Sequence, residues 1–271
     1  MANYHDFHEQ IVFQILAWVP VIYLFRCKSV CKQWLSIISN PLFDQTRLIN
    51  SHQRPSILAV AETSGDSRYG FCGISNSFKD SAILHLPTYL SGNQDYWSLS
   101  SCNGLVCFSD YKAIDIYLWN PSTRQCCNIL SPPKIPSKKW AFTGLYFDSI
   151  CNDYKILRIN VYHKYPVRVE IYSTNSGSWR EIEVDDEVET SITSMINCGL
   201  VIKETLYING RDELISFQLH NEMFKLVPLP SVKLRVVMDR RSSIFDYEGR
   251  VGLILHCHDD ETLSLWLVTR P

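Results

Sequence analysis

The sequence lacks the short motifs by which many enzymes are recognised. It has no Gly-x-Ser-x-Gly, no P-loop and no Gly-x-Gly-x-x-Gly. It also lacks a large excess of either charge, because its formal net charge is only −2. A net charge this small gives no overall attraction to nucleic acid or to an anionic membrane. We therefore expect a protein that is not an enzyme, uses no cofactor and binds no nucleic acid.

The chain also has no apolar run long enough to span a bilayer. The longest, residues 11 to 25, is interrupted by Gln14 and Pro20 and falls short of the roughly 18 to 20 residues that a membrane helix needs. The segment before it carries Asp6 and Glu9 but no Lys or Arg, which is unlike a signal peptide. We expect no association with a membrane.

Regularly spaced cysteines are missing as well. The 271 residues include 10 cysteines, but their spacing does not resemble the framework of a small disulfide-linked secreted domain. Reduced thiols, which behave as small buried apolar groups, are the better interpretation. This favours a cytoplasmic or nuclear location, or both.

Glycine is absent between residues 7 and 43, and this segment has helical periodicity instead. Pro20 and the pair Asn40-Pro41 divide it into two predicted helices, since proline cannot continue a helix. The apolar positions of the first helix are Ile11, Ile15, Leu16 and Val19, and those of the second are Leu24, Cys27, Cys31, Trp34, Leu35 and Ile38.

Cys27 and Cys31 could belong to a metal site, a redox pair, a basic nucleic-acid-binding helix or a packed helix face. A structural zinc site needs two further ligands, and the nearest downstream cysteine is the distant Cys72. A redox pair is normally Cys-x-x-Cys rather than two cysteines four apart. No cluster of base-reading side chains accompanies the nearby lysines. The i, i+4 spacing therefore favours two cysteines that pack on one helix face.

The two predicted helices carry more apolar side chains than they can bury against each other. Trp18, Tyr23 and Phe25 add to the apolar face, and a module this small usually requires a partner. We infer that it docks onto another part of the chain or onto another protein.

Residues 15 to 43 resemble the F-box of plant F-box proteins and align with its pattern without a gap. The matching positions are Ile15, Leu16, Pro20, Val21, Leu24, Arg26, Cys27, Val30, Cys31, Lys32, Trp34, Ile38, Pro41 and Phe43. The resemblance implies a three-helix F-box module at residues 1–45. It would bind the Skp-type linker subunit of a cullin-RING (SCF) ubiquitin ligase. The residues that it implies for linker binding or for the module's own core are Ile11, Ile15, Leu16, Pro20, Leu24, Cys27, Val30, Cys31, Trp34, Leu35 and Ile38.

The sequence departs from the F-box pattern at its start. The usual Leu-Pro is replaced by Phe7-His8, the usual acidic residue is Gln14, and a usual leucine is Phe25. Loss of the proline removes a residue that favours the start of a helix. Phe7 can still act as an apolar staple, so we expect linker binding to be weakened but not abolished.

After Pro55 the sequence changes to short β-prone runs separated by turn residues. Three segments share one pattern, in which a strand ending in an aromatic residue leads through a polar turn to a second strand: residues 116–129, 169–184 and 213–230. They recur about every 45 to 55 residues, as the blades of a β-propeller do. A β-sandwich is the main structural alternative.

Residues 96 to 267 resemble the F-box-associated domain of plant F-box proteins. The most recognisable elements are the segments YLWNPSTRQ at 117–125 and VEIYSTNSGSWREI at 169–182. Kelch repeats would show paired glycines after a strand, and none occur. The resemblance implies an α+β multidomain protein in which the F-box module is followed by a connecting segment and first β strands at 46–95. An all-β, propeller-like domain would occupy residues 96–271. Because residues 263–268 resemble a strand that introduces a further hairpin, we expect an incomplete propeller that is cut short at its C-terminus.

Two clusters could still carry chemistry or binding. His256, Cys257 and His258 are the densest group of metal-type ligands, but in a strand Cys257 would point away from the two histidines. The acidic run from Glu181 to Glu189 is most simply a solvated loop, and a docking patch for a basic partner is the alternative. We expect no metal site.

The sequence therefore predicts a substrate receptor of an SCF ubiquitin ligase. The F-box would bind the linker subunit, and the β domain would bind a target protein whose identity the sequence does not reveal. Two alternatives remain open. One is a degenerate or truncated F-box protein that acts as a non-ligase scaffold. The other is a propeller-type hydrolase or lectin, which would need carboxylates or histidines converging at one mouth of the ring.

Overall fold

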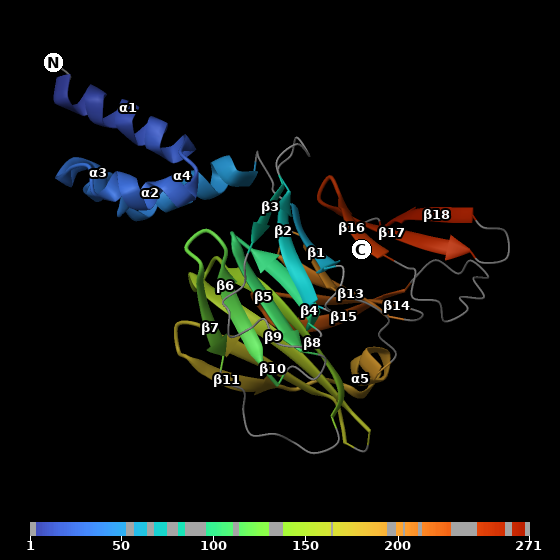
Figure 1. Ribbon diagram of the computed structural model, residues 1–271. Helices are drawn as coiled ribbons and strands as arrows, with labels where there is room; N and C mark the ends of the chain where they lie inside the picture. The colour runs from blue at the N-terminus through green and yellow to red at the C-terminus, as the bar shows by residue number, and fades with distance from the viewer. Residues whose placement is uncertain are drawn as a thin grey trace. The chain divides into compact units, whose positions relative to one another are not determined.

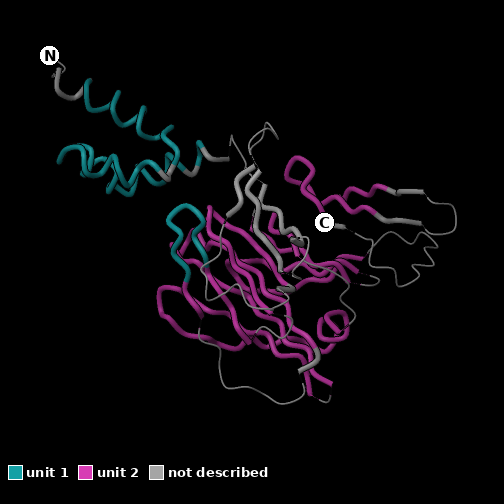
Figure 2. The backbone as a smooth tube through the Cα atoms, in the orientation of Figure 1, with its two compact units in different colours: residues 1–95, 119–126 teal, residues 96–118, 127–271 magenta. Residues whose placement is uncertain are grey.

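The computed structural model describes residues 4–52, 57–63, 68–74, 81–84, 96–110, 114–129, 138–163, 165–193, 199–202, 204–210, 213–228, 243–257 and 262–268. Helices occupy the N-terminal part and strands dominate the rest (Figure 1). The chain divides into two compact units (Figure 2), residues 1–95 with 119–126 and residues 96–118 with 127–271. The helical module and the β domain are therefore described separately.

Residues 4–52, the described part of the N-terminal module, form four helices. They are α1 (Tyr4–Trp18), α2 (Val21–Lys28), α3 (Lys32–Ile38) and α4 (Pro41–His52). The break that Pro20 predicts is confirmed, because α1 ends at Trp18 and Pro20 lies at the N-cap of α2. A small hydrophobic core holds the helices together, formed by Leu16, Ala17, Leu24, Ile37, Ile38 and Phe43.

The prediction of one continuous helix from Leu24 to Ile38 is wrong. α2 ends at Lys28, where the backbone N–H groups of Ser29 and Val30 donate to carbonyls of the last turn. Cys31 is extended, with φ −159° and ψ 166°, and its Sγ accepts a hydrogen bond from the Trp34 N–H at 3.5 Å as the N-cap of α3. Cys27 is half-buried and Cys31 is exposed, so the two thiols do not share a helix face. Apolar periodicity continues across this short break, which is why the sequence did not reveal it.

A fourth helix was not predicted from the sequence. Asn40-Pro41 ends α3 as expected, but it also starts α4, because the Asn40 side chain accepts from the Leu42 N–H at 2.9 Å. Proline suits the first position of a helix, where its missing N–H costs nothing. α4 places Phe43 in the core with no exposed surface, edge-on to Phe13 at 5.3 Å between ring centroids. The module thus contains one helix more than the three that the F-box resemblance implies.

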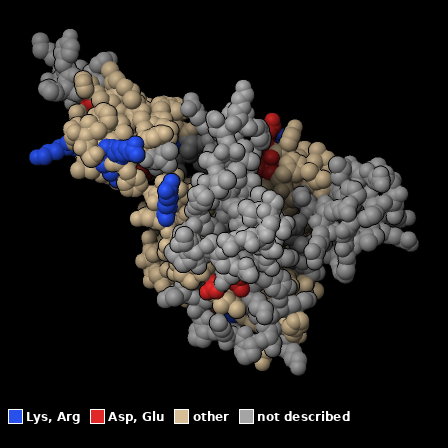
Figure 3. All heavy atoms as spheres, viewed as in Figure 1, with Lys and Arg blue, Asp and Glu red and all other residues tan. Residues whose placement is uncertain are grey.

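Positive side chains are prominent on this module. Lys and Arg side chains protrude from its surface in Figure 3. Among the residues of α2 and α3, Arg26 and Lys32 are exposed and Lys28 is half-buried. These three cations are the charged residues of the two helices.

The strands in the described residues form five antiparallel sheets, each built from strands consecutive in sequence. The first contains β1 (Ile57–Thr63), β2 (Arg68–Ile74) and β3 (Ser81–Leu84). Three sheets of four strands follow. The second sheet contains β4 (Tyr96–Cys102), β5 (Leu105–Asp110), β6 (Ile116–Asn120) and β7 (Gln125–Ile129). The third contains β8 (Lys138–Asp148), β9 (Asp153–Tyr162), β10 (Arg168–Ser173) and β11 (Ser178–Ile182), and the fourth contains β12 (Gly199–Ile202), β13 (Thr205–Asn209), β14 (Glu213–Gln218) and β15 (Met223–Pro228). The last contains β16 (Ser243–Tyr247), β17 (Arg250–Cys257) and β18 (Thr262–Leu267).

The three repeated segments are confirmed as the outer hairpins β6–β7, β10–β11 and β14–β15 of the four-stranded sheets. Each turn has four residues, and its fourth residue has a positive φ: Arg124 at 59°, Gly177 at 64° and Glu222 at 57°. A left-handed residue at this place turns the chain back into the second strand. Glycine suits this conformation best, and Gly177 alone of the three supplies it.

Consecutive sheets in the β domain pack against one another. β8 is the last strand in the order β11-β10-β9-β8, and polar side chains of the preceding sheet meet its backbone. Ser98 Oγ accepts from the Thr143 N–H at 3.2 Å and donates to the Thr143 carbonyl at 2.8 Å. Ser100 Oγ accepts from the Leu145 N–H at 2.8 Å. These bonds satisfy backbone groups that an edge strand would otherwise leave unpaired.

Apolar side chains fill the space between the sheets. One cluster joins β5 and β6 to β8 and β9, and a larger one joins the β8–β11 sheet to the β12–β15 sheet. A third joins β12 and β14 to β17. A succession of four-stranded meanders packed in this way is propeller-like and is not a β-sandwich of two facing sheets. The predicted fold, N-terminal helices followed by an all-β propeller-like domain, is confirmed.

The acidic run from Glu181 to Glu189 contains a helix, so the prediction of a loop is wrong there. α5 (Asp186–Thr193) begins after Asp185, whose carboxylate accepts from the Val188 N–H at 2.9 Å. Val188 and Ile192 are buried against the neighbouring sheets. Negative side chains in the first turn suit the positive end of a helix. The acids thus cap and flank α5 in addition to facing solvent.

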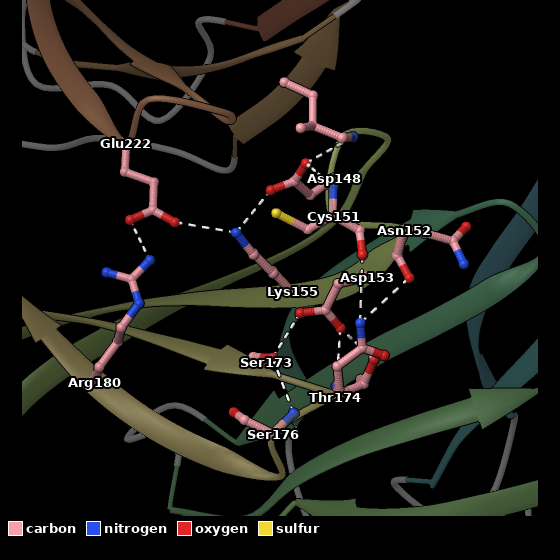
Figure 4. A network of polar contacts seen from close by, with 12 residues as sticks. Asp148, Cys151, Asn152, Asp153, Lys155, Ser173, Thr174, Ser176, Arg180 and Glu222 are labelled. Atoms are coloured by element: carbon pink, nitrogen blue, oxygen red, sulfur yellow. Dashed lines mark hydrogen bonds and ion pairs between the residues drawn. The ribbon is translucent and has the colours of Figure 1, made fainter.

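A network of polar contacts connects the β8–β9 turn to the β14–β15 turn of the next sheet (Figure 4). Lys155 Nζ lies 2.7 Å from Asp148 Oδ2 and 3.2 Å from Glu222 Oε1, and Glu222 also pairs with Arg180. Asp153, on the same strand as Lys155, accepts hydrogen bonds from the last residue of β10 and from the turn that follows it, namely Ser173, Thr174 and Asn175. Lys155 therefore connects the β8–β9 and β14–β15 turns, and Asp153 attaches the β10–β11 turn to β9.

The two aspartates of this network are held in their ionised forms. Burial opposes ionisation of Asp148, but hydrogen bonds from Lys155 and from the Cys151 backbone outweigh it and lower the pKa to about 2. Burial also opposes ionisation of Asp153, and its three donors again outweigh it and lower the pKa. A carboxyl group with a depressed pKa in the folded state stabilises the fold above its unfolded pKa of about 4 and loses that contribution as the pH falls.

We expect acid to weaken the β domain and Asp148→Asn to make it less sensitive to acid. At pH 7 the variant should lose about 3 kcal/mol of unfolding free energy, because Lys155 would lose a charged partner in a largely buried site. Between pH 4 and pH 2 the wild type should lose more stability than the variant does. Urea unfolding at several pH values measures both effects, and parallel curves for the two proteins would contradict the assignment.

Candidate partner-binding surface

The structure divides the predicted linker-binding residues into two groups. Leu16, Leu24 and Ile38 are 1–5% exposed and form the core of the helical module, with Cys27 and Trp34 half-buried against them. The remaining predicted residues are exposed: Ile11, Ile15, Pro20, Val30, Cys31 and Leu35. Only this second group is available to a partner.

Exposure of large apolar side chains is the main property of this second group. Ile11, Ile15, Val30 and Leu35 are 46%, 60%, 62% and 46% exposed. Ile11 and Ile15 lie four residues apart on α1, and Trp18, at 45%, extends the same helical stripe by one further turn. We call the exposed apolar residues of the module the apolar surface; they are Ile11, Ile15, Trp18, Tyr23, Phe25, Val30, Leu35, Leu42 and Ile49.

Several members of the apolar surface were not among the predicted linker-binding residues. The sequence indicates Trp18, Tyr23 and Phe25 only as a surplus of apolar side chains. Leu42 and Ile49 lie on α4, the helix that was not predicted. Their spacing of seven residues, two helical turns, was the signal in the sequence that could have found them.

Arg47 of α4 fixes the C-terminal end of α1. Its Nη1 donates to the Val19 carbonyl at 2.5 Å and lies 3.4 Å from the carbonyl oxygens of Leu16 and Ala17. The last carbonyls of a helix have no partner within the helix, and a cation also suits the negative end of its dipole. Burial lowers the pKa of Arg47, and nearby Asp44 partly opposes that effect. Arg47 thereby orients α1, which carries Ile11, Ile15 and Trp18.

Metal-ligand chemistry has no candidate cluster in the part of the chain that the structure describes. No group of three His, Cys, Asp or Glu side chains there could hold a metal ion. The side chains of His256 and Cys257, and all of His258, lie outside the described residues. Within the same described residues, every helix is too short or too polar to cross a membrane.

The chain thus combines a compact helical module that has unburied apolar side chains with a propeller-like β domain. Models of two domain families match these two parts: the F-box domain at residues 5–46 and the F-box associated beta propeller domain at residues 57–269. The second match covers most of the chain. The chain therefore belongs to the family of F-box proteins with an F-box-associated β-propeller domain, and the predicted family is confirmed.

Curated relatives support this membership, and several are F-box proteins of Arabidopsis thaliana. The F-box/kelch-repeat protein At3g23880 is 28% identical over 95% of this chain and 74% of its own length. The F-box protein At5g07610 is 24% identical over 82% of this chain and 56% of its own. The probable F-box protein At5g47300 is 26% identical over 98% of this chain and 65% of its own. The chain thus spans about half to three-quarters of the length of these relatives.

Replacing Arg47 should loosen α1. Arg47→Ala removes a charged donor from partly buried carbonyls, and we expect the free energy of local unfolding of α1 to fall by about 2 kcal/mol. Hydrogen exchange of the α1 amides in the whole chain measures this. Arg26→Ala is the matched control, because Arg26 is exposed and should change exchange by no more than about 0.5 kcal/mol. Equal effects of the two substitutions would contradict the role of Arg47.

Proposed function

We propose that this protein is a substrate-recognition subunit of an SCF ubiquitin ligase. Its F-box module would bind a Skp-type linker subunit, and through it a cullin-RING assembly. Its β domain would bind a target protein. The observation that carries the proposal is the exposure of Ile11, Ile15, Val30 and Leu35 on a module that matches the F-box family.

Apolar exposure supports a protein partner for the module. Single apolar residues are common on protein surfaces, but many large exposed apolar side chains on one small module indicate an interface. The aromatic members Trp18, Tyr23 and Phe25 belong to the residue types that dominate binding energy in interfaces. Burying these side chains against a linker subunit would give the module the apolar contacts that its own small core does not provide.

The proposed mechanism is proximity, and this chain would break and form no bonds itself. A receptor that holds a target beside a charged conjugating enzyme raises the effective concentration of the reacting groups. The β domain suits the target-binding role because its sheets are fixed to one another by hydroxyl, ionic and apolar contacts. Turns on such a rigid frame can vary in sequence and so select different targets. Cytoplasm, nucleus or both would be the place of action, where the other subunits of the ligase act.

A non-ligase scaffold is the second candidate, and the altered F-box start favours it. His8 replaces the usual proline and is an exposed residue within α1. A scaffold would bind target proteins without recruiting the ligase. Reconstituted ligase containing this chain separates the two: transfer of ubiquitin to a captured target supports the receptor, and target binding without linker binding or transfer supports the scaffold.

Ile15→Asp tests linker binding at an exposed position. Because Ile15 is 60% exposed, the substitution should leave the fold intact, whereas a change at the buried Leu24 would unfold the module. We expect affinity for a purified plant Skp-type linker subunit to fall roughly thirtyfold, the effect of losing about 2 kcal/mol at an interface. Isothermal titration calorimetry with the whole chain measures it.

The control is the same substitution at another exposed isoleucine. Ile150 is 75% exposed in the turn between β8 and β9, so Ile150→Asp should bind the linker as the wild type does. Circular dichroism of both variants checks that the helices persist. Absence of linker binding by the wild type would refute the ligase proposal.

A further inference from the structure

The third strand of each four-stranded sheet carries an aromatic residue at its penultimate position. These residues are Trp119 in β6, Tyr172 in β10 and Phe217 in β14. Trp266 has the same place in β18, the third strand of the last sheet. This position groups β18 with three strands that each have a neighbouring strand on both sides.

Backbone hydrogen bonds support the equivalence of Trp266 with Tyr172 and Phe217. Two residues after each aromatic, a backbone N–H donates to a carbonyl on the side of the second strand: Thr174 to Tyr154 at 3.0 Å, Leu219 to Glu204 at 3.0 Å and Val268 to Val251 at 2.9 Å. Backbone groups alternate in direction along an antiparallel strand. The N–H and C=O groups of Trp266 therefore also point to the second strand, and those of Leu265 and Leu267 point to the free edge.

The fourth strand in two of these sheets places a second aromatic residue directly opposite the first. Tyr172 is paired with Trp179, and their ring centroids are 5.3 Å apart. Phe217 is paired with Phe224, and their ring centroids are 4.7 Å apart. Aromatic pairs on neighbouring strands stabilise a sheet. The same arrangement beside β18 would require an aromatic residue opposite Trp266.

β18 has no such fourth strand among the residues that the structure describes. It is the last strand in the order β16-β17-β18, with β17 as its described neighbour (Figure 1). Leu265, the residue before Trp266, is 60% exposed, whereas its counterpart Ile171, the residue before Tyr172, is 1% exposed. Leu267 lies on the same face as Leu265 and is 39% exposed. The strand thus has the pattern of an interior strand but an exposed apolar face.

β18 also lacks the residues that protect an exposed edge strand. Natural edge strands commonly carry charged residues or proline, which oppose pairing with another chain. The edge strand β11 contains Arg180 and Glu181, and the edge strand β15 contains Lys225 and Pro228. Residues 262–267 contain no charged residue, no proline and no glycine. The free edge of β18 is therefore suited to pairing with another strand.

The strand that fits this edge best is β18 of a second copy of the chain. Antiparallel pairing about a twofold axis places Trp266 opposite Trp266 of the second copy, which supplies the required aromatic pair. Leu265 then lies opposite Leu267 of the second copy, and the backbone groups of these two residues can exchange both hydrogen bonds.

Charge along the sequence favours the antiparallel arrangement of two copies. Three acids at residues 259–261 precede the strand, and Arg270 follows it. Antiparallel strands bring the acidic flank of one copy towards the cationic flank of the other, whereas parallel strands would bring like charges together.

We propose that this protein forms a twofold-symmetric dimer in which β18 pairs antiparallel with β18 of a second copy, with Trp266 opposite Trp266. The inference does not depend on the proposed function. Association closes at two copies, because the pairing uses the same edge on both chains. The dimer would contain two β domains, so a partner with two binding sites would be held more tightly than by a single chain.

Leu265→Lys tests this pairing at an exposed position. The substitution places a charge opposite Leu267 of the second copy, in a contact that is otherwise apolar. We expect the dissociation constant of the dimer to rise at least about tenfold. Sedimentation equilibrium of the whole chain over a wide range of concentration measures it. The wild-type mass should increase with concentration from the 31.4 kDa of one chain towards twice that value.

Leu267→Glu provides a rescue that depends on the proposed register. By itself it should weaken the dimer as Leu265→Lys does. In an equimolar mixture of the two variants, the introduced carboxylate lies opposite the introduced ammonium group, and Leu267 of one variant lies opposite Leu265 of the other. A mixed dimer should therefore form with nearly the wild-type affinity.

The matched control is Met223→Lys, which changes a 55% exposed apolar residue to the same cation on another edge strand, β15. It should leave the association of the two chains unchanged. Thermal unfolding of every variant checks that it folds as the wild type does.

Four results would overturn the inference. A wild type that stays monomeric at every concentration would leave the edge of β18 to another part of the chain or to a segment of a target protein. Wild-type association of Leu265→Lys would show that β18 is not the contact. Equal weakening by Met223→Lys would show that the effect is not specific to β18. A mixture of the two variants that stays monomeric would refute the antiparallel register.

Discussion

The limited core of the helical module is the constraint on which its surface depends. Four short helices surround Leu16, Ile38 and Phe43, and little more apolar area can be enclosed at this size. The remaining apolar side chains stay exposed on α1, α2, α3 and α4. A module of this kind is stable enough to fold and keeps an apolar surface for a partner. Because little apolar area can be buried inside the module, its core is small and its remaining apolar side chains are available to the proposed partner.

The β domain has the opposite requirement, because its sheets must keep fixed positions relative to one another. Ser98 and Ser100 satisfy the backbone of β8, and Lys155 connects the turn that follows β8 to Glu222 in the next sheet. Buried groups of this kind must all be paired, so they define how neighbouring sheets align. A target-binding domain needs this rigidity more than the linker-binding module does, because turns select a target only when their frame is fixed.

Prediction from the sequence was accurate where local chemistry is unambiguous. The outer hairpins were found because polar turn residues separate their strands, among them Asn120-Pro121, Asn175 to Gly177 and Asn221. Errors arose where two structures share one pattern. Apolar spacing from Leu24 to Ile38 suits one helix or two, and the acids after Glu181 suit a loop or the capped start of α5. Asn40-Pro41 indicates the end of one helix, although the same pair can also begin the next helix.

The amino-acid sequence alone determined the family, the two-part organisation and the set of residues from which a linker-binding surface could be built. It determined these because periodicity, turn residues and the F-box pattern are all local properties of the chain. Tertiary structure decided which of those residues are buried and which are exposed: Leu24 entered the core while Ile15 remained outside. It also decided the role of Arg47, which lies far along the chain from the α1 carbonyls that it binds. Burial and long-range hydrogen bonds depend on how helices meet, and no spacing along a single helix specifies that.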